Sequence, residues 1–181
     1  MGGYGSGVRG GGSPKQTVED CRVLSAAKLQ SDDLLGEGRY GGGRLVWTRT
    51  STGEEVGSIG YLIDTLKPSD WHLRLQYNLT LWRTGKREWL DYRVSLTTTP
   101  LPWGGLRWWF LCPLLKDGRP CGRRCGKLYL PPGGKYFGCR LCYDLTYRSA
   151  QEAHRFDGLY AALAAEVGLS PGRVRTLLKD G

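Results

Sequence analysis

The stretch that decides the fold is Trp108–Tyr147, WWFLCPLLKDGRPCGRRCGKLYLPPGGKYFGCRLCYDLTY. It holds five of the six cysteines of the chain, which are Cys112, Cys121, Cys125, Cys139 and Cys142. Thiolates at this spacing, with a Pro-Gly-Gly turn between the two groups, suit one tetrahedral zinc ion better than a set of disulfides. We therefore predict a metal site in this stretch.

A tetrahedral site needs two pairs of ligands, each delivered by a tight loop that points its sulfurs at one spot. Cys139 and Cys142 have the two-residue gap that such a loop uses. For the other pair we favour Cys112 and Cys121, because Cys125 then lies inside the predicted strand RRCGKLYL. The alternative, in which Cys125 replaces Cys112 or Cys121 as a ligand, stays open. Four sulfur ligands leave no position for water or substrate, so the predicted zinc is structural.

The cysteine pairs resemble the knuckles of a zinc ribbon, a small β module in which two such loops clamp one zinc ion. The resemblance covers Trp108–Tyr147, and the eight-residue gap after Cys112 departs from the usual short one. The segments MGGYGSG and PPGGKYFGCRLCYDLTY are also similar to uncharacterised bacterial proteins, some of them carried by phages and mobile elements. This similarity implies a bacterial or phage setting. Because MGGYGSGVRGGGS lacks the apolar core of a signal peptide, we expect a cytoplasmic location.

The composition is that of a folded and basic protein. There are 26 Lys and Arg against 17 Asp and Glu, and 40% of the residues are hydrophobic. A positive surplus of this size favours polyanions, of which nucleic acid is the commonest. The chain has only two His, scattered carboxylates and neither a phosphate-binding glycine loop nor an HExxH pair, so we expect no enzymatic activity.

Alternating apolar residues predict one antiparallel sheet before the cysteines. In WHLRLQYNLTLW, from Trp71, every second residue is apolar, which is typical of a half-buried strand. We predict two N-terminal helices over the apolar face, one starting near Thr17 and one at residues 26–32. The predicted strands are Arg44–Thr50, Val56–Asp64, Trp71–Trp82, Trp89–Thr99 and Leu106–Leu111.

The opposite face of this predicted sheet is basic and rich in amides. It carries Gln76, Asn78, Arg93 and Trp89, which could hold a backbone and stack a base. The residues that we predict to contact nucleic acid here are Arg74, Arg83, Lys86 and Arg87.

The C-terminal sequence LYAALAAEVGLSPGRVRTLLKDG predicts two helices around a short turn. The first, Leu159–Val167, stops at Gly168, and Ser170 is the predicted N-cap of the second, with Pro171 at its first position. This pattern resembles the helix-turn-helix of DNA-binding proteins, whose second helix enters the major groove. A small residue, Ala164, lies four residues before the turn glycine Gly168, as in that motif. The resemblance implies that Leu169, Val174 and Leu177 face inward. The nucleic-acid contacts that it implies are Ser170, Arg173, Arg175, Thr176 and Lys179, with Arg175 as the reader of guanine.

Together these patterns predict an α+β protein in four parts. They are a flexible glycine-rich arm at 1–14, helices and sheet at 15–107, a zinc ribbon at 108–147, and a helix-turn-helix-like segment at 148–181. The predicted function is a zinc-containing nucleic-acid-binding protein, acting on duplex DNA as a regulator or recruiting factor of a phage or mobile element. The alternative is a protein-interaction module that redirects or inhibits an enzyme, anchored by exposed Trp103, Trp108 and Trp109.

Overall fold

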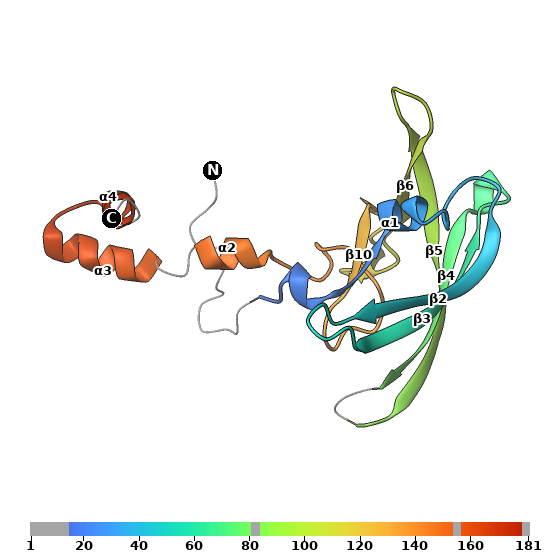
Figure 1. Cartoon of the computed structure of the whole chain (residues 1–181), viewed down its shortest axis with the longest axis horizontal. Coiled ribbons are helices and arrows are strands. Elements are labelled where there is room, and N and C mark those ends of the chain that lie inside the picture. Colours follow the sequence, from blue (N-terminus) through green and yellow to red (C-terminus); the bar gives the residue numbers. More distant parts are fainter. Residues whose placement is uncertain (1–14, 81–83, 154–156, 179–181) are drawn as a thin grey trace. The chain divides into compact units, whose positions relative to one another are not determined.

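The structure, a computed structural model, describes residues 15–80, 84–153 and 157–178 (Figure 1). The chain forms two compact units. One unit is Asp20–Asp144, and the other combines the chain up to Glu19 with the chain from Leu145 onward. The predicted sheet region and the cysteine stretch, which the sequence analysis separates at residue 108, therefore belong to one unit.

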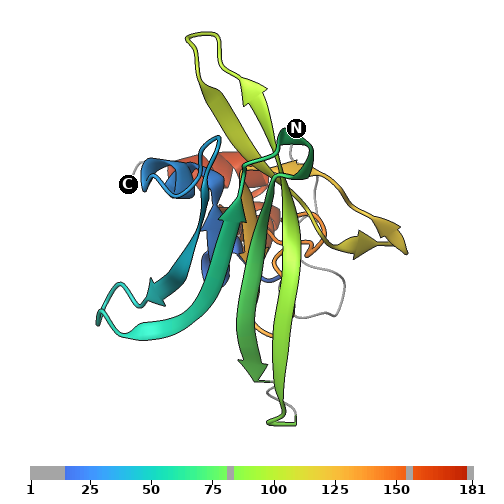
Figure 2. The same cartoon turned by 90° about the vertical axis from the view of Figure 1, so that its right-hand side faces the viewer.

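The larger unit contains a six-stranded antiparallel sheet with the order β2-β3-β4-β5-β6-β9 (Figure 2). The first five strands follow one another along the chain, so each pairs with its neighbour in sequence. The α+β class with mostly antiparallel strands is confirmed. The strands are β2 (Tyr40–Thr48), β3 (Glu55–Asp64), β4 (His72–Thr80), β5 (Arg87–Pro100), β6 (Leu106–Leu111) and β9 (Arg124–Cys125); the short 3-10 helix η2 (Pro68–Asp70) precedes β4.

The period of two in the sequence decides which face of the sheet is buried. In β4 the side chains of Leu73, Leu75 and Tyr77 are buried, whereas the residues between Leu73 and Tyr77 on the other face are half-exposed. Val94 of β5 and Phe110 of β6 join the same core and are 0% exposed. This continuous apolar layer is the largest source of stability in the unit.

The predicted helix that starts near Thr17 is wrong. A 3-10 helix, η1 (Val18–Asp20), is followed by strand β1 (Arg22–Ser25), which pairs antiparallel with β10 (Lys127–Leu130). The strand is favoured because its backbone satisfies the edge of β10, while Leu24 packs into the core at 2% exposure.

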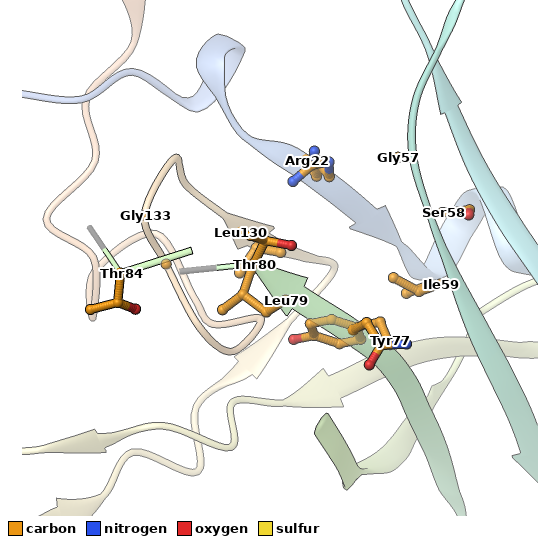
Figure 3. A pocket seen from close by; sticks show the side chains of 12 residues that line it. Arg22, Gly57, Ser58, Ile59, Tyr77, Leu79, Thr80, Thr84, Leu130 and Gly133 are labelled. Carbon is orange, nitrogen blue, oxygen red and sulfur yellow. The ribbon is translucent and has the colours of Figure 1, made fainter. Parts of the chain in front are cut away.

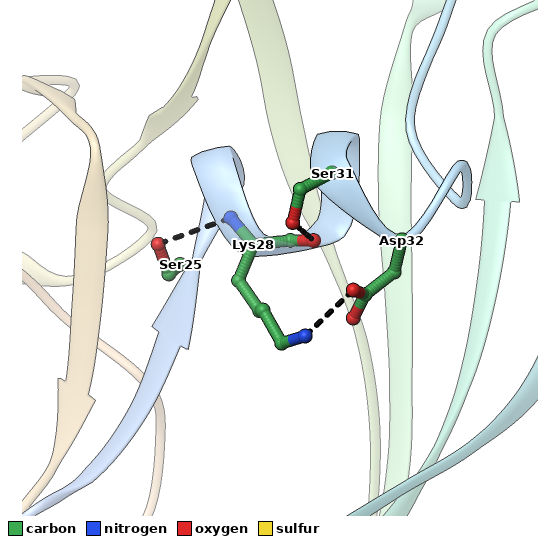
Figure 4. A network of polar contacts seen from close by, with 4 residues as sticks. All are labelled: Ser25, Lys28, Ser31 and Asp32. Carbon is green, nitrogen blue, oxygen red and sulfur yellow. Dashed lines mark hydrogen bonds and ion pairs between the residues drawn. The ribbon is translucent and has the colours of Figure 1, made fainter.

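The second predicted N-terminal helix is confirmed as α1 (Ala26–Ser31). Ser25 caps its start by accepting a hydrogen bond from the backbone N–H of Lys28 at 3.4 Å (Figure 4). The Lys28 ammonium reaches Asp32 one turn later at 2.6 Å, and the Ser31 hydroxyl donates to the Lys28 carbonyl. Ala26 and Leu29 belong to the core, so one helix, and not two, adds to the apolar layer.

The other unit contains α2 (Arg148–Ala153), α3 (Asp157–Val167) and α4 (Pro171–Leu177). The predicted capping is confirmed, because Ser170 Oγ accepts from the backbone N–H of Arg173 at 3.4 Å. Gly168 ends α3 with φ 64°, and the small side chain of Ala164 is buried. None of the described helices is long and apolar enough to span a bilayer.

Two of the three inward positions predicted for these helices are wrong. Val174 is buried at 6% exposure, as expected. Leu169 and Leu177 are 37% and 61% exposed. The reason is geometric, because α4 has only seven residues. In the described part of α3 and α4 the buried side chains are those of Ala164 and Val174.

Candidate metal centre

Four cysteine sulfurs converge on one point in the larger unit. The Sγ atoms of Cys112, Cys121, Cys139 and Cys142 all lie within 4.8 Å of one another. The Cys112–Cys142 pair is 3.8 Å apart and the Cys121–Cys139 pair 3.9 Å. A tetrahedron with metal–sulfur bonds of about 2.3 Å has sulfur–sulfur edges of about 3.8 Å, whereas a disulfide needs about 2.05 Å. The four thiols are therefore placed to bind one metal ion.

A small hairpin accounts for the long gap between the first two cysteines. Strand β7 (Leu115–Lys116) pairs antiparallel with β8 (Arg119–Pro120). Asp117 and Gly118 form the turn, with φ of 53° and 75°. Two successive residues at positive φ are typical of the two-residue hairpin turn that suits the twist of paired strands. The eight intervening residues thus double back on themselves and leave their ends side by side.

Backbone hydrogen bonds at the base of this hairpin fix the first cysteine pair. Cys121 N–H donates to the Leu114 carbonyl at 2.8 Å, and Gly122 N–H donates to the Cys112 carbonyl at 3.2 Å. Cys112 N–H donates to the Arg123 carbonyl at 3.0 Å. These bonds place the two sulfurs on the same side of the loop.

The second loop is tighter and directs its amides at sulfur. Cys142 N–H lies 3.1 Å from the Cys139 carbonyl and 3.4 Å from Cys139 Sγ. Cys139 N–H donates to Cys112 Sγ at 3.2 Å, which ties the two loops together. Hydrogen bonds from backbone amides stabilise thiolate sulfur and orient it toward a shared ion.

Gly138 sets how closely the two loops approach. Its backbone is bridged to Tyr129 of β10 by hydrogen bonds of 2.8 and 3.0 Å, which returns the chain to the site. A Cβ atom at this position would lie 2.1 Å from the Leu114 side chain and 3.0 Å from that of Tyr143. A residue without a side chain is therefore required next to Cys139.

Burial opposes ionisation of several of these thiols. Burial raises the pKa of Cys112, and burial together with the neighbouring thiols Cys121 and Cys139 raises that of Cys142. Burial also opposes ionisation of Cys121, but hydrogen bonds from the Arg123 backbone and from nearby thiols lower its pKa overall. Four thiolates repel one another, and a divalent ion at their centre removes that repulsion.

Cys125 lies beside this group but is not part of it. It stands on β9 opposite Phe110 of β6, and its thiol donates to the Arg123 carbonyl at 3.1 Å. Burial, with the adjacent Cys139 and Cys112, raises its pKa to about 12. Cys125 therefore stays protonated at neutral pH, next to the four converging sulfurs.

The basic residues predicted on the outer face of the sheet differ in whether their charge is already paired with a carboxylate. Arg74 makes two hydrogen bonds to the Asp91 carboxylate, at 2.6 and 2.5 Å, so its charge is already paired. Lys86 and Arg87 are exposed and have no ion pair within the described part of the chain. Arg83 lies outside the described residues.

The predicted contact residues of the C-terminal helices are partly engaged within their own helix. Ser170 Oγ caps α4, and Thr176 Oγ1 donates to the Gly172 carbonyl at 3.1 Å. Arg173 is exposed. Arg175 lies in α4, but its side chain and the whole of Lys179 are outside the described part of the structure.

The expectation of three exposed tryptophans is wrong for Trp108. In β6 the side chains of Trp108 and Phe110 face the core, and Trp108 is 3% exposed with its ring 4.7 Å from that of Trp71. Trp109 points to the other face, where the Arg107 guanidinium lies 5.6 Å from its ring. Trp103 is 98% exposed in the turn between β5 and β6.

A cluster of basic residues around the cysteines was not predicted from the sequence. Cys112–Cys142 contains seven Lys and Arg and a single acidic residue, Asp117. A local charge count would have found this cluster. Five of these basic residues are exposed and have no ion pair among the described residues: Lys116, Arg119, Arg123, Arg124 and Lys127.

Three comparisons with known proteins were made. They found no protein-family model that matches the chain, no similar curated protein and no similar solved structure.

Proposed function

We propose that this protein binds nucleic acid through a zinc-stabilised basic module, with duplex DNA as its target. Four sulfur ligands in tetrahedral spacing favour zinc or an iron–sulfur centre over harder cations. The 3.8 and 3.9 Å sulfur–sulfur separations match the edge of a single-ion tetrahedron. With all four positions filled by sulfur, the ion is structural and orders the surrounding loops.

The observation that carries the proposal is the unneutralised charge of the cysteine module. The cysteine module, residues 112–142, holds seven basic residues and one acidic residue, and Lys135 among them is paired with Glu88. A zinc ion held by four thiolates would subtract two further charges. The five exposed members of the cluster, Lys116, Arg119, Arg123, Arg124 and Lys127, are free to meet phosphate. Duplex DNA gains affinity from exposed cations of this kind, because each neutralised phosphate releases condensed counterions.

The sheet offers a weaker surface for the same ligand. Arg74 of β4 is paired with Asp91, and Arg44 of β2 is paired with Glu55. A carboxylate within contact of each cation cancels most of its attraction for phosphate. The cysteine module is therefore the favoured site of phosphate contact.

The second helix of the C-terminal pair adds sequence selectivity to the proposal. Arg173 and Arg175 of α4, with Lys179, are the candidates for contacts to base edges and nearby phosphates. In this scheme the cysteine module supplies affinity that depends on salt, and α4 supplies preference among sequences. The setting proposed is a regulator or recruiting factor of a phage or mobile element in a bacterial cytoplasm.

A salt titration of binding to a fluorescent 20-base-pair duplex tests the proposal. The double variant Arg119→Gln/Arg124→Gln is expected to reduce the slope of log K against log salt by about 1.8, because each lost phosphate contact removes about 0.9. The matched control Arg44→Gln/Arg74→Gln removes two residues that are already paired and should leave the slope nearly unchanged. Equal losses in both doubles, or binding without salt dependence, would contradict the proposal. Single-stranded DNA and RNA of the same sequence decide the preferred strand type.

One observation supports the second candidate, a protein-interaction module. Trp103 is 98% exposed in a turn that includes Gly104 and Gly105 at positive φ. Exposed tryptophans often anchor protein interfaces. If this reading is correct, Trp103→Ala abolishes a protein partnership and leaves duplex binding at its original affinity.

A further inference from the structure

Strands β3 and β4 separate part of the way along their length. Their ladder runs from the Asp64–His72 pair to the Gly60–Gln76 pair and stops there. Both strands continue beyond this point, β3 back to Glu55 and β4 on to Thr80. On its other edge each strand stays paired, β3 with β2 and β4 with β5, so the β2–β3 and β4–β5 hairpins diverge (Figures 1 and 2).

The divergence leaves two strand edges facing each other without a ladder between them. They are residues 55–59 of β3 and residues 77–80 of β4. One of the exposed carbonyls, that of Val56, accepts a hydrogen bond from the Arg22 guanidinium at 2.8 Å. Unpaired strand edges are a template for a further strand, because their N–H and C=O groups still need partners.

Two cavities open at this gap. The first has a volume of about 640 Å³ and the second about 490 Å³, and both are lined by Ser58, Ile59, Tyr77 and Asn78. Ile59 and Tyr77 are core residues, whereas Ser58 and Asn78 alternate with them and point to the other face. The gap is therefore accessible from both faces of the sheet.

The two cavities differ in chemistry. The first is bounded by Leu130 of β10 and by Arg22 of β1, the only charged residue among the described residues that line it (Figure 3). Arg22 is exposed and has no carboxylate partner within the described part of the chain. The second cavity is bounded by Trp89, which is 59% exposed, and by Arg44, which is paired with Glu55.

We propose that this gap is a binding site for an extended peptide segment of another protein, which adds a strand between β3 and β4. Alternate side chains of an added strand point to opposite faces, so neighbouring residues of the peptide enter the two cavities. The residue on the Arg22 side is acidic, because the cavity holds an unpaired cation and no carboxylate. The residue on the other side is apolar and packs on Trp89.

A peptide fits these features better than a small ligand or a nucleic acid. Neither of the latter has the regular series of amide donors and acceptors that two facing strand edges can satisfy. This site is separate from the basic cluster of the cysteine module, so the inference does not rest on nucleic-acid binding.

The test is selection of a displayed library of random ten-residue peptides on the full-length chain. Enrichment of β-branched sequences with one Asp or Glu near the centre is expected. A selected peptide should bind the Arg22→Glu variant at least tenfold more weakly, and replacing the peptide's acid by Lys should restore that binding. Lys67→Glu, an equally exposed charge reversal away from the gap, is the matched control and should bind as the original chain does.

Two further measurements separate strand addition from a merely electrostatic contact. Bound peptide should slow amide hydrogen exchange in residues 55–59 and 77–80, and N-methylation of alternate peptide amides should abolish binding. Gly57→Leu places a side chain in the first cavity, where its Cβ would lie 2.8 Å from Arg22 Nε, and should also abolish binding. The backbone there is not at positive φ, and the atoms met are the end of the flexible Arg22 side chain, which can move, so the fold should tolerate the change.

The proposal is overturned if no peptide is enriched, if selected peptides bind the Arg22→Glu variant equally well, or if N-methylated peptides bind as tightly as their parents. A concentration-dependent dimer that Arg22→Glu abolishes, with no peptide enriched, would assign the gap to a second copy of this chain. Loss of duplex binding in Arg22→Glu with no peptide enriched would assign it to nucleic acid.

Discussion

The six-stranded sheet and the strands around the cysteines are ordered by different interactions. In β4 and β5 one face of each strand holds the apolar core side chains, and Leu75 and Val94 are 0% exposed. Strands β7, β8 and β9 have two residues each, and most of their side chains are exposed. Long strands with a period of two can order themselves by burying apolar area. Short, exposed strands need a fixed set of ligands at their base.

Removing the metal ligands should produce the largest contrast between the two regions. Cys139→Ser is expected to reduce bound zinc from about one ion per chain to none and to remove amide-exchange protection across residues 112–126, because structural zinc contributes roughly 10–16 kcal/mol of apparent binding free energy. The amides of β2–β5 should stay protected. Metal analysis and hydrogen exchange measure both effects.

The control for that experiment is Cys125→Ser, which removes the thiol beside the site. Its sulfur lies outside the group of four, so zinc content and protection should be retained. Full protection of residues 112–126 in metal-free Cys139→Ser would show that the sulfurs do not order this region.

A substitution in the core of the sheet should have the opposite effect: it should destabilise the sheet and leave the metal site unchanged. Leu75→Ala removes a side chain that is 0% exposed and should lower the free energy of unfolding by about 2–5 kcal/mol. Zinc bound per folded chain should not change. Chemical denaturation measures the loss, and Leu115→Ala in β7, where the side chain is 67% exposed, should cost less than about 0.5 kcal/mol. Similar losses of unfolding free energy at both positions would contradict the idea that apolar burial orders the sheet but not the strands around the cysteines.

A smaller effect is expected from backbone strain in the first cysteine loop. Gly122 has φ 56°, and no heavy atom lies within 4 Å of an added Cβ, so Gly122→Ala adds only the left-handed penalty of about 1 kcal/mol. This should raise the apparent dissociation constant of zinc about fivefold. Gly126→Ala is the control, since its φ is not positive and Trp109 is at an ordinary contact distance. A competition assay with a chelator would measure the two zinc dissociation constants. Equal constants for Gly122→Ala and Gly126→Ala would contradict the predicted strain at Gly122.

The smallest effect concerns the paired charges of the sheet. Hydrogen bonds from Arg74 and Gln76 lower the pKa of the Asp91 carboxyl. A lowered folded-state pKa stabilises the fold above the ordinary aspartate pKa, and this contribution is lost as the pH falls through the lower folded value. Arg74→Gln should therefore raise the Asp91 pKa, as followed by NMR titration of the carboxyl. Because the pair is exposed, the change in stability should be slight and should shrink with salt. An unchanged pKa would show that Arg74 does not hold this carboxylate.

The sheet and the second cysteine pair could be predicted because both depend on patterns between residues close in sequence. Alternation in β4 and β5 and the Cys139–Cys142 spacing need only neighbouring residues. Strand β1 could not be predicted this way, since its partner β10 lies far along the chain and the capping pattern near Thr17 suggested a helix instead. The same alternation, applied to β6, would have placed Trp108 beside Phe110 on the buried face.

Continuity of the backbone links the two regions at one residue. Strand β6 ends at Leu111, and the next residue is Cys112. A sulfur of the site is therefore held by the same register that pairs β6 with β5 and β9. If a bound ion stabilises the pairing of β6 with its neighbours by some factor, that pairing must strengthen ion binding by the same factor, because coupling between two equilibria is reciprocal. Loss of the ion should therefore weaken not only residues 112–126 but also the end of β6 at Leu111.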